Sequence, residues 1–220
     1  MPILTHAQET FNVNDYADFD RYQTMNSSLK ASGVVPKVVL MGNSITEGWV
    51  DSRPDFFAKN DLIGRGIGGQ VSHQMLLRFH ADVIDLRPEV VVILVGTNDL
   101  AHNSGPVSID QIVDNIRSMA TLARSSGITV LLCSVLPASD FPWSPVDNPV
   151  PSIVDLNLRI KQYADDHDHA YVDYYSALVD DAGGLKVPDY TSADDLVHPN
   201  EEGYKVMEKV LLKTLKPIIE

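Results

Sequence analysis

Runs of apolar residues alternate with amphipathic segments along almost the whole chain. Five of these runs are nearly continuous in apolar residues, which is typical of parallel strands whose two faces are both covered by helices. The predicted strands are 37–41, 61–64, 89–95, 128–135 and 170–174. The run at 61–64 gives the weakest of the five signals.

The segments between these runs carry apolar residues at the spacing of helices that bury one face. The predicted helices are 18–31, 71–85, 108–124, 153–163 and 201–216. Ser108 and Asn200 immediately precede two of them, and their side-chain oxygens suit them to serve as N-caps. Strands and helices that alternate in this way predict an α/β domain with a mostly parallel sheet.

The length and the net charge of the chain limit its domain organisation and its partners. The 220 residues suffice for one sizeable core, so we expect a single domain over 1–220, with 1–35 as an N-terminal helical extension packed on it. Seventeen Lys and Arg against thirty Asp and Glu give a net charge of −13. This balance argues against nucleic acid or an anionic membrane surface as the main partner. Whether the chain forms a homo-oligomer stays open.

The N-terminus and the only cysteine carry two further expectations. The stretch "MPILTHAQETFNVN" has no basic region and no long apolar run, so we expect no signal peptide, no membrane insertion and a cytoplasmic protein. Cys133 lies in the apolar run "TVLLCSV", so a buried structural thiol is expected there rather than a nucleophile. One cysteine also excludes an internal disulfide.

Two stretches match the sequence motifs of ligand sites but lack the structural context that such sites need. In "GRGIGGQ" (64–70) the glycines spell the dinucleotide fingerprint, but the acidic residue expected about 20 positions on would be Asp82 or Asp85, inside a predicted helix. In "DDHDHAYVD" (165–173) the ligand types are consecutive, whereas metal ligands must converge. We therefore predict no nucleotide, no metal and no other cofactor.

The residues that follow the strands have the chemistry of acyl transfer. Ligands of open α/β sheets bind beyond the carboxyl ends of the strands, where this chain carries Ser44, Gly69 and Asn98. A serine nucleophile needs a base, and His198 is suited to that role, with Asp195 three residues earlier to orient the imidazole. The backbone N–H groups of Ser44 and Gly69 and the Asn98 amide are suited to hold an oxyanion.

Two rival protein classes fit these residues less well. The α/β-hydrolase fold places its serine in G-x-S-x-G, but Thr46 stands where the second glycine should be, and the chain is short for that fold. A non-catalytic binding module would be expected to lack Ser44, Asn98 or His198, and all three are present.

Four blocks, in order, resemble the SGNH hydrolases, also called GDSL-type esterases. They are "GNSIT" with Ser44, "RGIGGQ" with Gly69, "GTND" with Asn98, and "DLVHPN" with Asp195 and His198, and they span 42–200. The resemblance implies a three-layer α/β/α sandwich with a flavodoxin-like five-stranded parallel sheet. It also implies hydrolysis of short acyl esters without a metal.

The details of the blocks suggest a branch of that family. Asn43 stands where the family usually has Asp, and the other motifs are most similar to platelet-activating-factor acetylhydrolase-like esterases and bacterial carbohydrate acetylesterases. The resemblance implies acetyl esters of carbohydrates as the preferred small-molecule substrate. A lipid ester of the lysophospholipase or platelet-activating-factor type is the alternative.

One segment breaks the α/β pattern. Residues 136–152 contain five prolines, and loops of this length without secondary structure are often functional. Two interpretations stay open at this point. The segment is a rigid surface connection, or its Phe141 and Trp143 overhang a site.

Overall fold

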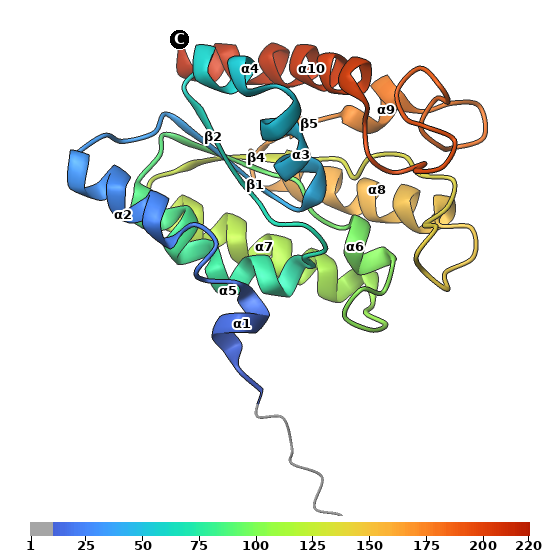
Figure 1. Cartoon of the computed structure of the whole chain (residues 1–220), viewed down its shortest axis with the longest axis horizontal. Coiled ribbons are helices and arrows are strands. Elements are labelled where there is room, and N and C mark those ends of the chain that lie inside the picture. Colours follow the sequence, from blue (N-terminus) through green and yellow to red (C-terminus); the bar gives the residue numbers. More distant parts are fainter. Residues whose placement is uncertain (1–10) are drawn as a thin grey trace, which may run out of the picture.

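A five-stranded, fully parallel sheet forms the centre of the computed structural model, which describes residues 11–220 (Figure 1). The strand order is β2-β1-β3-β4-β5, the order of flavodoxin-like sheets. The strands are β1 Val38–Gly42, β2 Leu62–Gly66, β3 Val90–Ile93, β4 Thr129–Cys133 and β5 Ala170–Val172. The predicted fold class is therefore confirmed.

Helices cover both faces of this sheet (Figure 1). One layer contains α5 Ser72–Asp82, α7 Ile109–Ser125 and α8 Val150–Asp166. The other contains α3 Ser44–Ser52, α4 Pro54–Lys59, α9 Tyr174–Leu178 and α10 Glu201–Ile219. A short helix, α6 Thr97–Leu100, follows β3, and the 3-10 turn η1 Ile84–Leu86 follows α5.

The alternation of side chains along the strands divides the interior into two cores. In β1, Val39 and Met41 face the α5, α7 and α8 layer, whereas Val38 and Leu40 face the α3 and α10 layer. All four side chains are buried. This explains why the strands are continuous in apolar residues: each position meets a helical layer on one side or the other.

Local capping contacts start two helices where the sequence predicts. The Ser108 side chain accepts a hydrogen bond from the backbone N–H of Gln111, and α7 begins directly after it. The Asn200 side chain accepts one from the N–H of Gly203, and α10 begins directly after it. Both predicted N-caps are confirmed, because a cap depends on contacts within one turn of chain.

The predicted helix 18–31 is wrong at its start. The chain instead forms α1 Val13–Ala17 and α2 Gln23–Ser32, separated by a turn in which Asp18 has a left-handed φ of 52°. Both helices contact α5. The first ten residues of the expected extension 1–35 lie outside the described residues, as does most of the stretch on which the expectation of no signal peptide rests.

Strand and helix boundaries also differ from the sequence pattern. β2 runs two residues further than expected, to Gly66, and the helix expected over 71–85 ends at Asp82.

Cys133 is buried at the end of β4, which confirms the expected structural thiol, and burial raises its pKa. In residues 11–220, no helix is long and apolar enough to cross a membrane.

Candidate active site

The turn from β1 into α3 places Ser44 at the carboxyl edge of the sheet. Ser44 is the first residue of α3, so its backbone N–H lies among the unpaired N–H groups of a helix start. Gly42 makes the turn tight, since a Cβ there would lie 2.0 Å from the Thr46 hydroxyl oxygen. A helix start of this kind suits a developing negative charge.

Asn43 is the N-cap of the same helix. Its side-chain oxygen accepts a 3.1 Å hydrogen bond from the backbone N–H of Ile45. Asparagine and aspartate cap helices about equally well. The structure therefore gives this position a capping role that either side chain can fill, and the cap here is uncharged.

Ser44, His198 and Asp195 form one hydrogen-bonded chain. The Ser44 Oγ lies 2.9 Å from His198 Nε2, and His198 Nδ1 lies 2.9 and 3.1 Å from the two Asp195 carboxylate oxygens. A carboxylate can only accept, so Nδ1 carries the proton and Nε2 is left to accept from the serine hydroxyl. This is the arrangement in which a histidine can take a proton from a serine.

Hydrogen bonds between the Asp195 side chain and the following backbone hold the Asp195–His198 loop in place. Asp195 Oδ1 accepts hydrogen bonds from the N–H groups of Val197 and His198 at 3.1 and 2.8 Å, and Leu196 has a left-handed φ of 66°. Burial alone would raise the pKa of Asp195, but the hydrogen bonds and the charge of His198 outweigh it and lower that pKa below its ordinary value. Asp195 therefore stays ionised beside the imidazole.

The loop after β2 runs directly beside the nucleophile. A Cβ on Gly68 would lie 3.8 Å from the Ser44 Cβ, and the next residue, Gly69, has a φ of +76° that favours glycine. Asn98, in the first turn of α6, donates a 2.9 Å hydrogen bond from Nδ2 to the carbonyl of Gln70. The structure thus places Asn98 against the loop that contains Gly69, and places that loop beside Ser44.

The packing of α3 on β2 explains one glycine of "GRGIGGQ". Gly66 lies within β2, and a Cβ there would meet the backbone of α3, 2.3 Å from the Glu47 nitrogen and 2.6 Å from the Asn43 oxygen. Gly66 therefore allows α3 to pack against β2. No dinucleotide role is needed to explain it.

A buried arginine behind the site was not identified from the sequence. Arg78 donates to the carbonyls of Gly42 and Arg65, both at 3.0 Å, and to the side-chain oxygen of Gln70 at 2.6 Å. It also pairs with Asp82 at 2.8 Å. One guanidinium thus connects the ends of β1 and β2 to the loop that contains Gly69. A charged pair on the buried stripe of α5 was the sequence signal for it.

Asp99, next to Asn98, is a second residue whose role was not identified from the sequence. Its carboxylate accepts 3.0 Å hydrogen bonds from the backbone N–H of Ser72, the first residue of α5. Burial raises the pKa of Asp99 to about 6, although the hydrogen bonds from Ser72 act in the opposite direction. Asp99 therefore ties the Asn98 turn to the start of α5.

Of the two aromatic residues expected to overhang a site, Trp143 lies beside the candidate site and Phe141 does not. Its ring centroid lies 6.3 Å from that of His198, with 30° between the ring planes. Phe141, by contrast, is fully buried in the core. One of the two aromatic residues anchors the segment and the other lies beside the candidate base.

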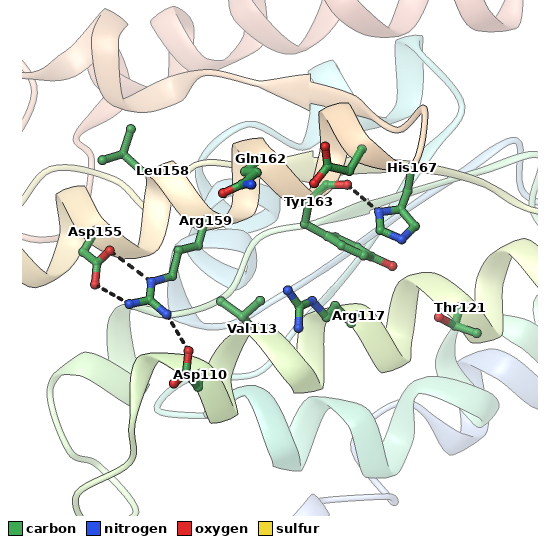
Figure 2. Close-up of a pocket in the computed structure, with 11 residues that line it drawn as sticks. Asp110, Val113, Arg117, Thr121, Asp155, Leu158, Arg159, Gln162, Tyr163 and His167 are labelled. Atoms are coloured by element: carbon green, nitrogen blue, oxygen red, sulfur yellow. Dashed lines mark hydrogen bonds and ion pairs between the residues drawn. The ribbon is translucent and has the colours of Figure 1, made fainter.

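A cavity of about 760 Å³ lies away from these residues, between α7 and α8 (Figure 2). Arg159 bridges Asp110 and Asp155 across it, and Arg117 lies over the ring of Tyr163. None of the site residues above lines this cavity. Within residues 11–220, no group of three or more His, Cys, Asp or Glu side chains is placed to hold a metal ion.

Comparison with known proteins identifies the family. The model of the GDSL-like lipase/acylhydrolase family matches residues 40–206. A solved GDSL-like lipase from Bacteroides thetaiotaomicron is 45% identical, with a TM-score of 0.86, over 92% of this chain and 98% of that one.

Two curated relatives are more distant. An acetylxylan esterase of Xylanibacter ruminicola is 26% identical over 82% of this chain and 43% of its own length. An uncharacterized lipoprotein of Bacillus subtilis is 34% identical over 35% of this chain and 33% of its own length. The chain thus spans less than half the length of the curated relatives it matches. The family match covers all four sequence blocks and the strand ends that position them, and the chain belongs to the GDSL-like lipase/acylhydrolase family.

Proposed function

We propose that this chain hydrolyses short-chain acyl esters, with acetyl esters preferred, through an acyl-enzyme formed on Ser44. The observation that carries the proposal is the continuous contact from the Ser44 hydroxyl through His198 to the Asp195 carboxylate. A serine hydroxyl reacts poorly with esters until a base accepts its proton. Here the base is within hydrogen-bond distance and is held by an ionised partner.

In the proposed first step, Ser44 Oγ attacks the ester carbonyl carbon while its proton passes to His198 Nε2. The carbonyl oxygen becomes negatively charged in the tetrahedral intermediate. The N–H groups of Ser44 and Gly69 and the Asn98 amide are proposed to stabilise that charge. An amide nitrogen carries two hydrogens, so Asn98 can keep its bond to Gln70 and still donate to the oxyanion.

Collapse of the intermediate breaks the bond to the alcohol oxygen. His198 returns its proton to that oxygen, the alcohol leaves, and an acyl-Ser44 ester remains. Water then attacks the acyl-enzyme while His198 takes its proton, and His198 finally passes a proton to Ser44 Oγ as the carboxylic acid departs. Throughout the cycle Asp195 stabilises the charged imidazole.

For the alcohol part of the substrate we propose a carbohydrate. The support is the similarity to an acetylxylan esterase over most of this chain. The acidic composition also favours a small soluble ester over an anionic lipid surface.

A lipid ester is the second candidate, and one observation favours it. An apolar groove of about 560 Å³ runs between α2 and the edge strand β2, with Met25, Leu29 and Phe57 among its walls. Glu47, which is one turn along α3 from Ser44, also lines the groove. An acyl chain long enough to reach this groove would be stabilised there by apolar contact.

Replacing Ser44 by alanine tests the proposed chemistry. Ser44→Ala should lose hydrolysis of p-nitrophenyl acetate by at least about 10³-fold, because the nucleophile is absent. Ser52→Ala is the matched control, since Ser52 is an exposed serine at the other end of the same helix. Near-normal turnover by Ser44→Ala would refute the proposal.

A chain-length series separates the two substrate candidates. The wild-type rate would be measured on p-nitrophenyl esters from acetate to octanoate, beside an acetylated xylo-oligosaccharide. A preference for acetate and for the sugar ester supports the carbohydrate candidate. A rate that rises toward octanoate supports the lipid candidate.

A further inference from the structure

Trp143 is a large apolar side chain that stays half open to solvent beside the site. It is 48% exposed, although its ring lies against that of His198. Single exposed apolar residues are common on protein surfaces. This one is unusual in position, because it borders the imidazole that the proposed function uses as acid and base.

Contacts on its nitrogen and on its ring position the indole there. Its Nε1–H donates a 2.8 Å hydrogen bond to the side-chain oxygen of Asn103, and its ring packs on buried Phe141 with 5.8 Å between centroids. The next residue, Ser144, donates from its backbone N–H to the Phe141 carbonyl and from its hydroxyl to the Ala101 carbonyl, each at 2.8 Å. These contacts place the ring as a wall beside His198.

The same contacts connect Trp143 to the loop after β2. Because the Asn103 oxygen accepts from the indole, its Nδ2 is turned toward the carbonyl of Gly69, to which it donates at 3.2 Å. Asn103 thus bridges the aromatic wall and the glycine proposed as an oxyanion donor. The ring and the bridge are separable features, since one is apolar surface and the other is a pair of hydrogen bonds.

The reaction chemistry indicates which part of a substrate meets this wall. His198 must bring Nε2 within about 3 Å of the alcohol oxygen in order to protonate it. The group attached to that oxygen then lies beside the imidazole, where Trp143 is the neighbouring aromatic ring. The acyl group is bonded instead to the carbon under attack by Ser44.

We infer that Trp143 forms the subsite for the alcohol part of the ester and that its indole stacks against a sugar ring there. This inference rests on the proposed function. A sugar ring has an apolar C–H face and hydroxyl groups at its edge. A half-exposed indole covers such a face with large apolar area at low entropic cost and leaves the edge hydroxyls in water.

Three acetyl esters that differ only in the alcohol test the inference. They are ethyl acetate, acetylcholine and an acetylated xylo-oligosaccharide. Trp143→Ala should raise KM for the sugar ester and lower its kcat/KM by about tenfold, a typical loss for a well-packed aromatic contact. The other two esters should change by less than about threefold.

Two further variants separate the ring from its hydrogen bond. Trp143→Phe keeps an aromatic face and loses the N–H, so it should retain most of the activity on the sugar ester. Asn103→Ala removes the hydrogen bonds to Gly69 and to the indole but leaves the ring packed on Phe141, so it should affect all three esters alike. Leu122→Ala is the control, because Leu122 is another exposed apolar residue on distant α7.

An equal loss on all three esters, or a shifted acid limb of the pH–rate profile, would show that Trp143 acts through His198 and would overturn the subsite. No loss on any ester would also overturn it. A loss greatest for acetylcholine would assign the wall to a cationic alcohol and overturn the sugar assignment. If the wild type hydrolyses none of the three, it is the proposed function that fails.

Discussion

The hydroxyl of Tyr204 donates a 3.0 Å hydrogen bond to the carbonyl of Ile45. Tyr204 is on α10, which starts shortly after His198, and Ile45 directly follows Ser44. The Tyr204 ring also stacks on Trp49 of α3, with centroids 5.9 Å apart. One side chain therefore holds the two helices whose first turns adjoin the serine and the histidine.

Tyr204→Phe should keep the stacking and lose this hydrogen bond. The free energy of unfolding should fall by about 1 kcal/mol, which lowers Tm by roughly 2–4 °C in a chain of this size. We expect kcat to fall severalfold with KM unchanged, because the Ser44–His198 contact loosens. Tyr190→Phe is the control, since Tyr190 packs against the same core cluster. A lower Tm with unchanged kcat would limit Tyr204 to stability.

Asp195→Asn should leave the loop intact and still remove most of the activity. An amide oxygen can accept the N–H groups of Val197 and His198, but an amide does not favour the required imidazole tautomer or its charged form. We expect kcat for p-nitrophenyl acetate to fall by about 10⁴-fold. Asp194→Asn, at the exposed neighbouring position, should behave as wild type. A loss of less than about tenfold for Asp195→Asn would remove Asp195 from the mechanism.

Asn98→Ala should lower kcat by roughly 10²–10³-fold, as expected for loss of one oxyanion donor. The change also removes the hydrogen bond to Gln70, so thermal unfolding must be followed in parallel. Asn115→Ala is a useful comparison, because Asn115 donates to Ser72 and not to the Gln70 carbonyl. An effect on KM alone would place Asn98 in substrate binding.

The pH dependence of stability should carry the signature of Asp99. Its pKa in the folded protein is raised from 3.8 to about 6, so between about pH 4 and 6 the folded state holds a proton that the unfolded chain releases. The Asp99 contribution to the free energy of unfolding therefore falls as pH rises through this window, by about 3 kcal/mol at most.

Chemical denaturation of wild type and Asp99→Asn at pH 4.5 and pH 7.5 would check this. The wild type should gain stability relative to the variant at the lower pH, because an amide does not titrate. Asp114→Asn, at an exposed position of α7, should show no such change. Parallel profiles for wild type and Asp99→Asn would contradict a buried, titrating Asp99.

The sequence predicted well those features that depend on contacts within a short stretch of chain. The strands at 37–41 and 128–135 and the caps at Ser108 and Asn200 follow from side chains and backbone within a few residues. The juxtaposition of Ser44 with His198 was also within reach, since parallel strands end at one edge and only a few residue types can carry acyl transfer.

The features that the sequence did not predict depend on distant contacts. Arg78 was not identified from the sequence, and only the fold shows it joining the ends of β1 and β2. The place of Trp143 beside His198 depends on how a proline-rich loop folds back over the sheet edge. The need for glycine at position 66 appears only when α3 is packed against β2.

The burial of Cys133 has a practical use. It is the only cysteine in the chain, and its thiol is buried at the end of a central strand. A cysteine introduced at an exposed position would therefore be the one readily labelled thiol, without prior removal of the native residue. A fluorophore or spin label placed on the proline-rich loop could then report directly whether that loop changes when an ester binds.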